Sequence, residues 1–150
     1  MSAHCYISIE KHLKAQEVER DLKDIIHRKF KNLLKLECHI NENEICDWDV
    51  RFDSTHGFPV CLKTNGKLEF THPDDSWSYW AQSVFEDELA IKYNGKMLDD
   101  EYPQQELKPA PECHVTFQKY LETTMHHSKQ WKQAIIAVEL SHLPEELKKL

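Results

Sequence analysis

The sequence predicts an α+β domain in which an antiparallel sheet, formed by an N-terminal strand and a four-strand meander, carries three helices mainly on its apolar face. Two observations lead to this fold class. Several short segments alternate apolar and polar residues, as strands with one buried face do, and longer segments repeat apolar residues every three or four positions, as amphipathic helices do. No linker, repeat or low-complexity tract divides the 150 residues, so we expect one domain covering residues 1–150.

The chain opens with a strand and then a helix. Cys5, Ile7 and Ile9 alternate with polar neighbours, which indicates a half-buried strand. From Gln16 onward, apolar residues form one helical stripe. Its members are Val18, Leu22, Ile25, Ile26, Phe30 and Leu33.

The first hairpin of the meander has a register that the side-chain alternation determines. The residues expected to face the core are Leu34, Leu36, Cys38 and Ile40, and then Cys46, Trp48, Val50 and Phe52. A slip of one residue would expose all of them, so the loop must be 41–45. On the opposite face this register pairs Glu37 with Asp49 and His39 with Asp47.

The next hairpin, around 64–66, has two possible loops. An Asn-Gly turn of two residues would place Leu62 opposite Glu69. A three-residue loop with Gly66 in the left-handed conformation would place Leu62 opposite Leu68 instead. Because the second loop keeps the apolar residues on one face, we predict a G1 bulge.

The second half of the chain is predicted to contain two more helices and a short strand. Asp75 lies in an Asp-Asp-Ser run that suits the N-cap of a helix ending at 94–95, and 96–98 suits a strand. Residues 100–113 contain three prolines and are expected to be irregular. A third helix is expected from Phe117 until Pro144. Its apolar or aromatic stripe would be Tyr120, Leu121, Thr124, Trp131, Ile135 and Val138.

The composition narrows the range of partners. Nineteen Lys and Arg stand against 26 Asp and Glu, a formal charge of -7. Such a chain repels phosphate backbones and anionic lipid, so we expect a basic protein partner, no nucleic acid and no membrane. Charged residues near the N-terminus and the lack of a bilayer-length apolar run favour a cytoplasmic protein. The five scattered cysteines are expected to be reduced and buried.

One segment, PECHVTFQKYLE, has two readings. A two-histidine phosphoesterase needs two His-apolar-Ser/Thr-apolar elements on adjacent strands, and His114 to Phe117 is the single match. Thr116 also stands directly before an amphipathic run, where its hydroxyl would cap a helix. We predict the cap and keep the enzyme, with His114 and Thr116 as its residues, as the alternative function.

Metal and cofactor sites are not expected. Although there are ten histidines, no pair of His or Cys residues has the spacing along the chain that zinc sites use. The three glycines are accounted for by turns or a helix end, which leaves none for a phosphate-binding loop.

Acidic residues are the remaining candidates for a site. Any one acidic cluster can simply be a solvated surface, but together they suggest a negatively charged docking surface. The candidate partner-binding residues are Glu37, His39, Asp47 and Asp49 on the sheet, Glu86 and Asp87 on the second helix, and Asp99 and Asp100 after it.

A resemblance bears on what such a surface does. The segment FEDELAIKYNGKMLDDE (85–101), the proline-rich stretch after it and VTFQKYL (115–121) resemble the helix, Gly, short strand, acidic loop and helix of small bacterial immunity proteins from toxin systems. The likeness covers about a third of the chain. It implies an acidic cytoplasmic α+β domain that neutralises a cognate toxin by binding it. The alternatives are a histidine-dependent phosphoesterase and a non-catalytic subunit of a larger assembly.

Overall fold

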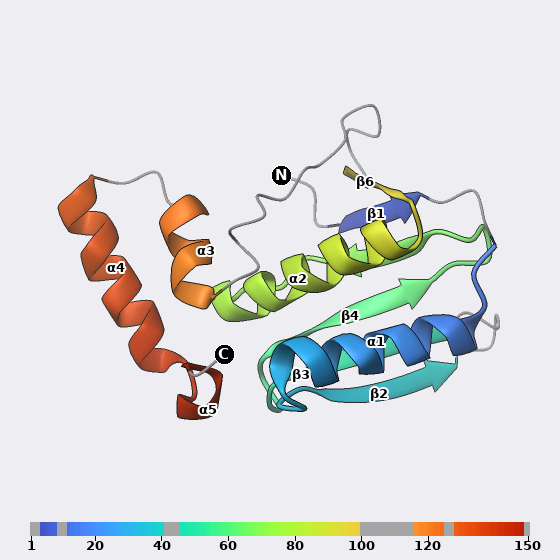
Figure 1. The fold of residues 1–150 in the computed structure, drawn as a ribbon, viewed down its shortest axis with the longest axis horizontal. Helices are drawn as coiled ribbons and strands as arrows, with labels where there is room; N and C mark the ends of the chain where they lie inside the picture. The colour runs from blue at the N-terminus through green and yellow to red at the C-terminus, as the bar shows by residue number, and fades with distance from the viewer. Residues whose placement is uncertain (1–3, 9–11, 41–45, 100–115, 125–127, 149–150) are drawn as a thin grey trace.

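The fold is a six-stranded antiparallel sheet with helices on one of its faces and a helical extension at one end (Figure 1). A computed structural model describes residues 4–8, 12–40, 46–99, 116–124 and 128–148. The elements are β1 (His4–Ser8), α1 (Ala15–Phe30), β2 (Lys35–Ile40), β3 (Cys46–Arg51), β4 (Gly57–Leu62), β5 (Leu68–Thr71), α2 (Ser76–Lys92), β6 (Lys96–Asp99), α3 (Phe117–Thr124), α4 (Lys129–His142) and α5 (Glu145–Lys148). The predicted α+β class is confirmed.

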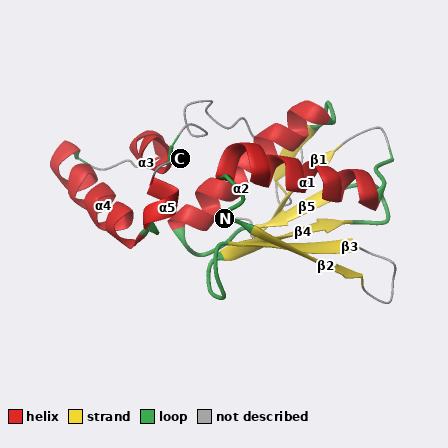
Figure 2. Cartoon of the chain, turned by 60° about the horizontal axis from the view of Figure 1, so that its bottom comes forward, coloured by secondary structure: helices red, strands yellow, loops and turns green. Residues whose placement is uncertain are grey.

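The strands follow the order β2-β3-β4-β5-β1-β6, so the N-terminal strand lies inside the sheet between β5 and β6. Figure 2 shows α1 and α2 lying over the same face of the strands. Within the described part of the chain, no helix is both long and apolar enough to cross a bilayer.

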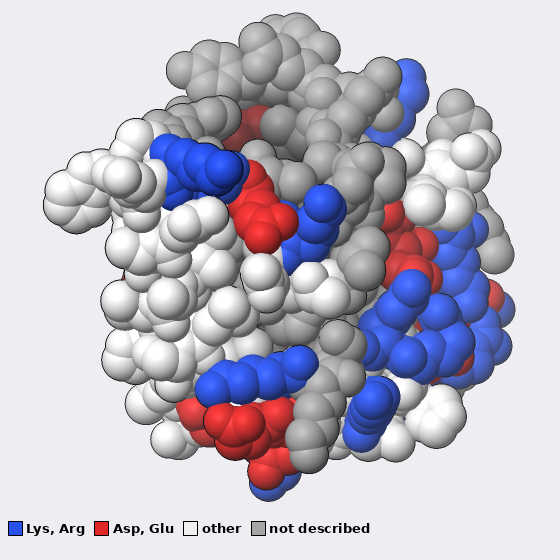
Figure 3. Space-filling model, turned by 60° about the vertical axis from the view of Figure 1, so that its left-hand side comes forward, with Lys and Arg blue, Asp and Glu red and all other residues white. Residues whose placement is uncertain are grey.

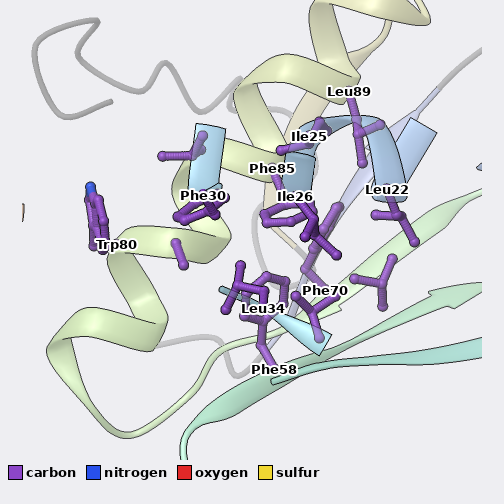
Figure 4. Packing of buried hydrophobic residues seen from close by; sticks show 14 of the residues in the cluster. Leu22, Ile25, Ile26, Phe30, Leu34, Phe58, Phe70, Trp80, Phe85 and Leu89 are labelled. Atoms are coloured by element: carbon purple, nitrogen blue, oxygen red, sulfur yellow. The ribbon is translucent and has the colours of Figure 1, made fainter. Parts of the chain in front are cut away.

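The core lies between these two helices and the sheet (Figure 4). The Phe30 ring of α1 stacks on Phe85 of α2 with centroids 5.5 Å apart, and Phe85 meets Phe58 of β4 edge-on at 5.4 Å. Offset and edge-on pairs of this kind add about 0.5–1.5 kcal/mol each to area burial. The three rings therefore join both helices to the sheet.

Both predicted hairpin registers are confirmed. Glu37 is opposite Asp49 and His39 is opposite Asp47 in the β2–β3 pair. In the β4–β5 pair, Leu62 is opposite Leu68. The loop between them is the predicted G1 bulge, because Gly66 has φ +83° and the Lys63 N–H donates to the Lys67 carbonyl at 2.9 Å.

The expectation that the cysteines are buried fails at the sheet edge. Cys38 lies on the predicted apolar face of β2 but is exposed, while Cys46 and Cys61 are half-buried. Since β2 is an edge strand, it has strand neighbours on one side alone, and α1 leaves Cys38 uncovered. Cys113 lies outside the described residues.

A proline in the interior strand β4 explains a buried polar residue of α2. The β4–β5 pairing ends at Val60 opposite Phe70, and one further step along both strands would set Pro59 opposite Thr71. Hydrogen-bonded pairs alternate from Lys63–Lys67, so Pro59 occupies a position whose N–H would donate to Thr71, and proline has none. Gln82, 1% exposed, donates its Nε2–H to the Thr71 carbonyl at 2.6 Å instead. The Thr71 carbonyl thus accepts a hydrogen bond from the helix layer.

The predicted caps of α2 are present. The Asp75 carboxylate accepts from the Ser78 N–H at 2.9 Å. At the other end Asn94 takes a left-handed conformation with φ 51°, and the Gly95 N–H donates to the Ala90 carbonyl at 2.8 Å. This is a Schellman ending in which asparagine, rather than glycine, supplies the positive φ.

The prediction of one long third helix on the sheet is wrong. α3 packs against α2, with Phe117 5.6 Å from Trp80 between ring centroids, and α4 follows as a separate helix. Ser128 has an extended ψ of 154°, which excludes a continuous helix. Figure 1 places α3, α4 and α5 beyond the end of the sheet. The part of α4 that packs inward is Ile136, while Trp131 and Val138 are 70% and 56% exposed.

Candidate functional site

The outer face of the sheet, opposite α1 and α2, is the candidate site (Figure 2). On its β2–β3 edge three cross-strand pairs follow one another, in which Lys35 is opposite Arg51 and the next two pairs carry the predicted residues. We call Glu37, His39, Asp47 and Asp49 the outer-face cluster. Period-two alternation places them on this face because Trp48 and Val50, 1% and 0% exposed, face the core.

Three members of the outer-face cluster converge on one point. His39 Nε2 lies 3.5 Å from Asp49 Oδ2 and 3.8 Å from Glu37 Oε2. These distances are at or beyond the hydrogen-bonding limit. The side chains are 58%, 36% and 65% exposed, so water screens their attraction. The three groups thus offer lone pairs to solvent or to a ligand more than they bind one another.

The same three residues have the geometry of metal ligands. One ligand atom from each lies within 4.8 Å of the others, and an imidazole with two carboxylates suits divalent transition ions such as zinc or manganese. The sequence search missed this arrangement because it examined ligand spacing along the chain. The signal that finds it is Glu-x-His on one strand with Asp49 opposite in the derived register. The remaining coordination positions would be filled by water.

Asp47, the fourth member, interacts with a different neighbour. It is opposite Cys61 of β4. Burial, with the hydrogen bond that the thiol donates to Asp47, raises the pKa of Cys61 to about 12. Cys61 therefore stays a neutral thiol near pH 7. The Asp47 carboxylate accepts its hydrogen bond and is held toward β4.

The other end of the same ladder is basic. Lys35 is opposite Arg51, and the last turn of α1, which leads into β2, contains His27, Arg28 and Lys29. Arg28 donates to Glu88 of α2 at 3.1 Å, which neutralises part of this charge. Figure 3 shows Lys and Arg side chains gathered at the right of that view, with fewer acidic ones among them. The outer β2–β3 face thus runs from positive at Lys35 to negative at its far end.

The remaining predicted acids lie elsewhere. Glu86 and Asp87 are half-buried on α2, in the helix layer. Asp99 lies on β6, the opposite edge strand, and pairs with Cys5. Asp100 lies outside the described residues. The structure therefore brings together four of the eight predicted residues and separates at least three from them.

An Asp–His pair in the β3–β4 loop is structural. Asp53 Oδ1 accepts from the N–H groups of Thr55 and His56, both at 2.8 Å, and from His56 Nδ1 at 2.9 Å. Burial alone would raise the pKa of Asp53, but these hydrogen bonds lower it to about 2. The His56 ring packs on Trp77 with centroids 4.0 Å apart. Thr55 Oγ1 also lies 3.0 Å from Asp53 Oδ1 and 2.9 Å from His56 Nδ1. The Asp53 carboxylate, which accepts two backbone N–H groups of its own loop, therefore fixes the loop.

The helix-cap reading of Thr116 is confirmed. Its Oγ1 accepts from the Lys119 N–H at 3.0 Å, and its carbonyl accepts from the Tyr120 N–H at 3.0 Å. His114, the other residue of the enzyme alternative, lies outside the described residues. The Thr116 hydroxyl thus serves as the N-cap of α3.

Two of the hollows formed by described residues lie away from the outer-face cluster. One of about 600 Å³ lies at the start of α1 and is lined by Lys14, Lys63 and Cys46 among others. The second, of about 310 Å³, is lined by Phe117 and Leu143 between α3 and the C-terminal helices. The first hollow is also lined by His12 and Thr64.

Comparison with family models, with curated proteins and with solved structures gave no match.

Proposed function

We propose that this chain is a binding module, an inhibitor of the immunity type that neutralises a basic partner protein, such as a toxin, by covering it with the outer β2–β3 face. The observation that carries the proposal is the outer-face cluster, four polar side chains on two paired strands with no described helix above them. The bacterial setting enters through the resemblance to immunity proteins alone, and the cytoplasmic setting rests on that resemblance and on the sequence pattern.

The position of the cluster on strands favours binding. Side chains on a paired sheet are already placed, so docking costs less conformational entropy than ordering a loop would. The change from positive to negative charge along the β2–β3 pair also favours one orientation of a bound partner. A partner whose basic group meets Glu37 and Asp49, and whose acidic group meets Lys35 and Arg51, is preferred over its reverse orientation.

The enzyme alternative has less support. Its hydroxyl, on Thr116, accepts a backbone N–H as a helix cap, and the outer-face cluster provides no nucleophile. An exposed His with two carboxylates can bind an ion or a cationic side chain without performing chemistry. We therefore favour binding over catalysis.

The test is to identify the partner and then titrate it. Pull-down from the native host supplies the partner, and its dissociation constant is measured at several salt concentrations for the wild type and for Asp47→Lys/Asp49→Lys. We expect the double variant to weaken binding by about tenfold or more and to flatten the salt dependence.

Two further variants make the test decisive. Glu37→Lys/Asp49→Lys makes the same charge change but leaves the hydrogen bond between Cys61 and Asp47 in place. Glu86→Lys/Asp87→Lys makes it on α2, away from the sheet. Unchanged affinity in both folded sheet variants would remove the outer face from consideration. Weakened binding in the α2 variant alone would move the docking site to the helix layer.

A further inference from the structure

Helix α4 has two apolar faces, and one of them is uncovered. Its inner face contributes Ile136, 7% exposed, and the chain after it contributes Leu143, 3% exposed. Its outer face carries Trp131 and Val138, which are 70% and 56% exposed. Buried tryptophan and valine contribute far more to stability than exposed ones, and a tryptophan with most of its surface in water is characteristic of protein interfaces.

The outer face has the spacing of a helix-pairing seam. Trp131, Ile135, Val138 and His142 follow one another at intervals of four, three and four residues. These intervals are those of alternating a and d positions in a heptad, which keep one stripe turned toward a partner helix. Ile135 is half-buried and His142 exposed, so the stripe is accessible along the helix.

We propose that α4 pairs with α4 of a second copy of this chain in an antiparallel, two-fold symmetric arrangement. In this arrangement Ile135 packs on Val138 of the second copy, and Trp131 packs over its His142. Because the symmetry axis repeats each contact, one stripe supplies both sides of the interface.

Charge along the flank of the stripe is what selects a second copy as the partner. Lys132 and Glu139 are seven residues apart and therefore lie on the same side of the helix, next to the seam. In an antiparallel pair this side of one helix lies against the same side of the other helix, which runs in the opposite direction. Each Lys132 therefore faces Glu139 of the other copy. A parallel pair would set the flank against Ala134 and Ser141 and gain neither ion pair.

The size of the surface determines the strength of the pairing. Fourteen residues make a helix about 21 Å long, which is short of a standard stable interface. The dimer is therefore weak, forming at roughly micromolar concentrations or above. The surface lies apart from the outer-face cluster, on a different element, so self-pairing and partner binding are independent properties.

The first experiment is sedimentation equilibrium of the whole chain from about 1 µM to about 1 mM. We expect a reversible monomer–dimer equilibrium that Trp131→Lys weakens by about tenfold or more. Ile91→Lys is the matched control, because Ile91 is an apolar residue on α2 that is 74% exposed. This variant should dimerise with the same dissociation constant as the wild type. Circular dichroism confirms that each variant keeps its helices.

The second experiment tests the orientation. Lys132→Glu alone and Glu139→Lys alone each bring like charges together, so each variant should be monomeric. Mixed in equal amounts they should form a heterodimer, and the variant with both changes should pair with itself as the wild type does. A monomeric wild type at every concentration, or a dimer that Trp131→Lys leaves unaltered, would overturn the proposal. Charge variants that all dimerise equally would overturn the antiparallel register.

Discussion

The hydrogen bond from Gln82 to Thr71 leads to a prediction in which two distant positions compensate each other. Replacing Gln82 with methionine keeps the volume of the side chain but removes the donor at 2.6 Å from the Thr71 carbonyl. At a position that is 1% exposed, water does not replace the donor. Removing the donor of a hydrogen bond from a buried position costs about 1–3 kcal/mol, so we expect the free energy of unfolding to fall by about 2 kcal/mol.

Pro59→Ala should reduce this cost. Alanine supplies an N–H at the position that the register, extended by one step beyond Val60 and Phe70, sets opposite Thr71, so the carbonyl would regain a donor within the sheet. Pro59→Ala has its own cost through the greater freedom of the unfolded chain, about 0.4–1 kcal/mol. That cost is the same with Gln or Met at position 82 and cancels in a double-mutant cycle. We expect the two substitutions to couple by about 1 kcal/mol or more.

The assay is urea unfolding followed by circular dichroism for the wild type, both single variants and the double variant. Ser83→Ala is the control, because Ser83 is also a buried polar residue of α2, but its hydroxyl donates to the Tyr79 carbonyl within the same helix. Ser83→Ala should show no coupling with Pro59→Ala. Costs for Gln82→Met and Pro59→Ala that add to within about 0.3 kcal/mol would refute the reasoning.

Three further predictions concern a cap, a loop and the candidate metal ligands. Thr116→Ala should lower the free energy of unfolding by about 1 kcal/mol through loss of the N-cap, measured by thermal melting; an unchanged melting curve would contradict the cap. The pKa of Asp53 is about 2 in the folded protein against 3.8 ordinarily. The ionised carboxylate therefore adds about 1 kcal/mol to the free energy of unfolding, after allowance for solvent screening. This contribution is fully present above pH 3.8 and is lost as the pH falls through 2. The stability difference between wild type and Asp53→Asn in urea should therefore shrink toward pH 2, and a constant difference would argue against it. Glu37, His39 and Asp49 are too exposed to retain zinc through dialysis, and one tightly held metal per chain in elemental analysis would contradict this.

The sheet was predictable from the sequence because its information is local. A strand repeats every two residues, so a one-residue error in the hairpin register would have exposed Trp48 and Val50 together. The same alternation placed His39 and Asp49 on one face. Their approach to 3.5 Å depends on side-chain rotamers, which alternation does not determine. The outer-face cluster was therefore predictable as a group, whereas its metal-ligand geometry was not.

The third helix shows where periodicity misleads. Thr124 and Trp131 are seven residues apart, which is close to two helical turns, so the apolar spacing continues past Ser128, whose extended ψ interrupts the helix. The inward face of α4 is instead set by Ile136 and the neighbouring Leu143. Likewise, the role of Gln82 depends on a proline in another strand, and no local pattern in α2 reveals it.

The position of β1 inside the sheet has a consequence for folding during synthesis. Ile7 leaves the ribosome before either of its partners, since it pairs with Leu68 on one side and with Met97 on the other. The β2–β5 meander is made of strands that follow one another along the chain. It can form early, because contacts between residues close in sequence form fastest. The N-terminal strand must then wait until most of the chain has emerged before it can insert between β5 and β6. A bulky group attached directly before β1 would hinder this insertion, so a step late in folding depends on a strand made before both of its partners.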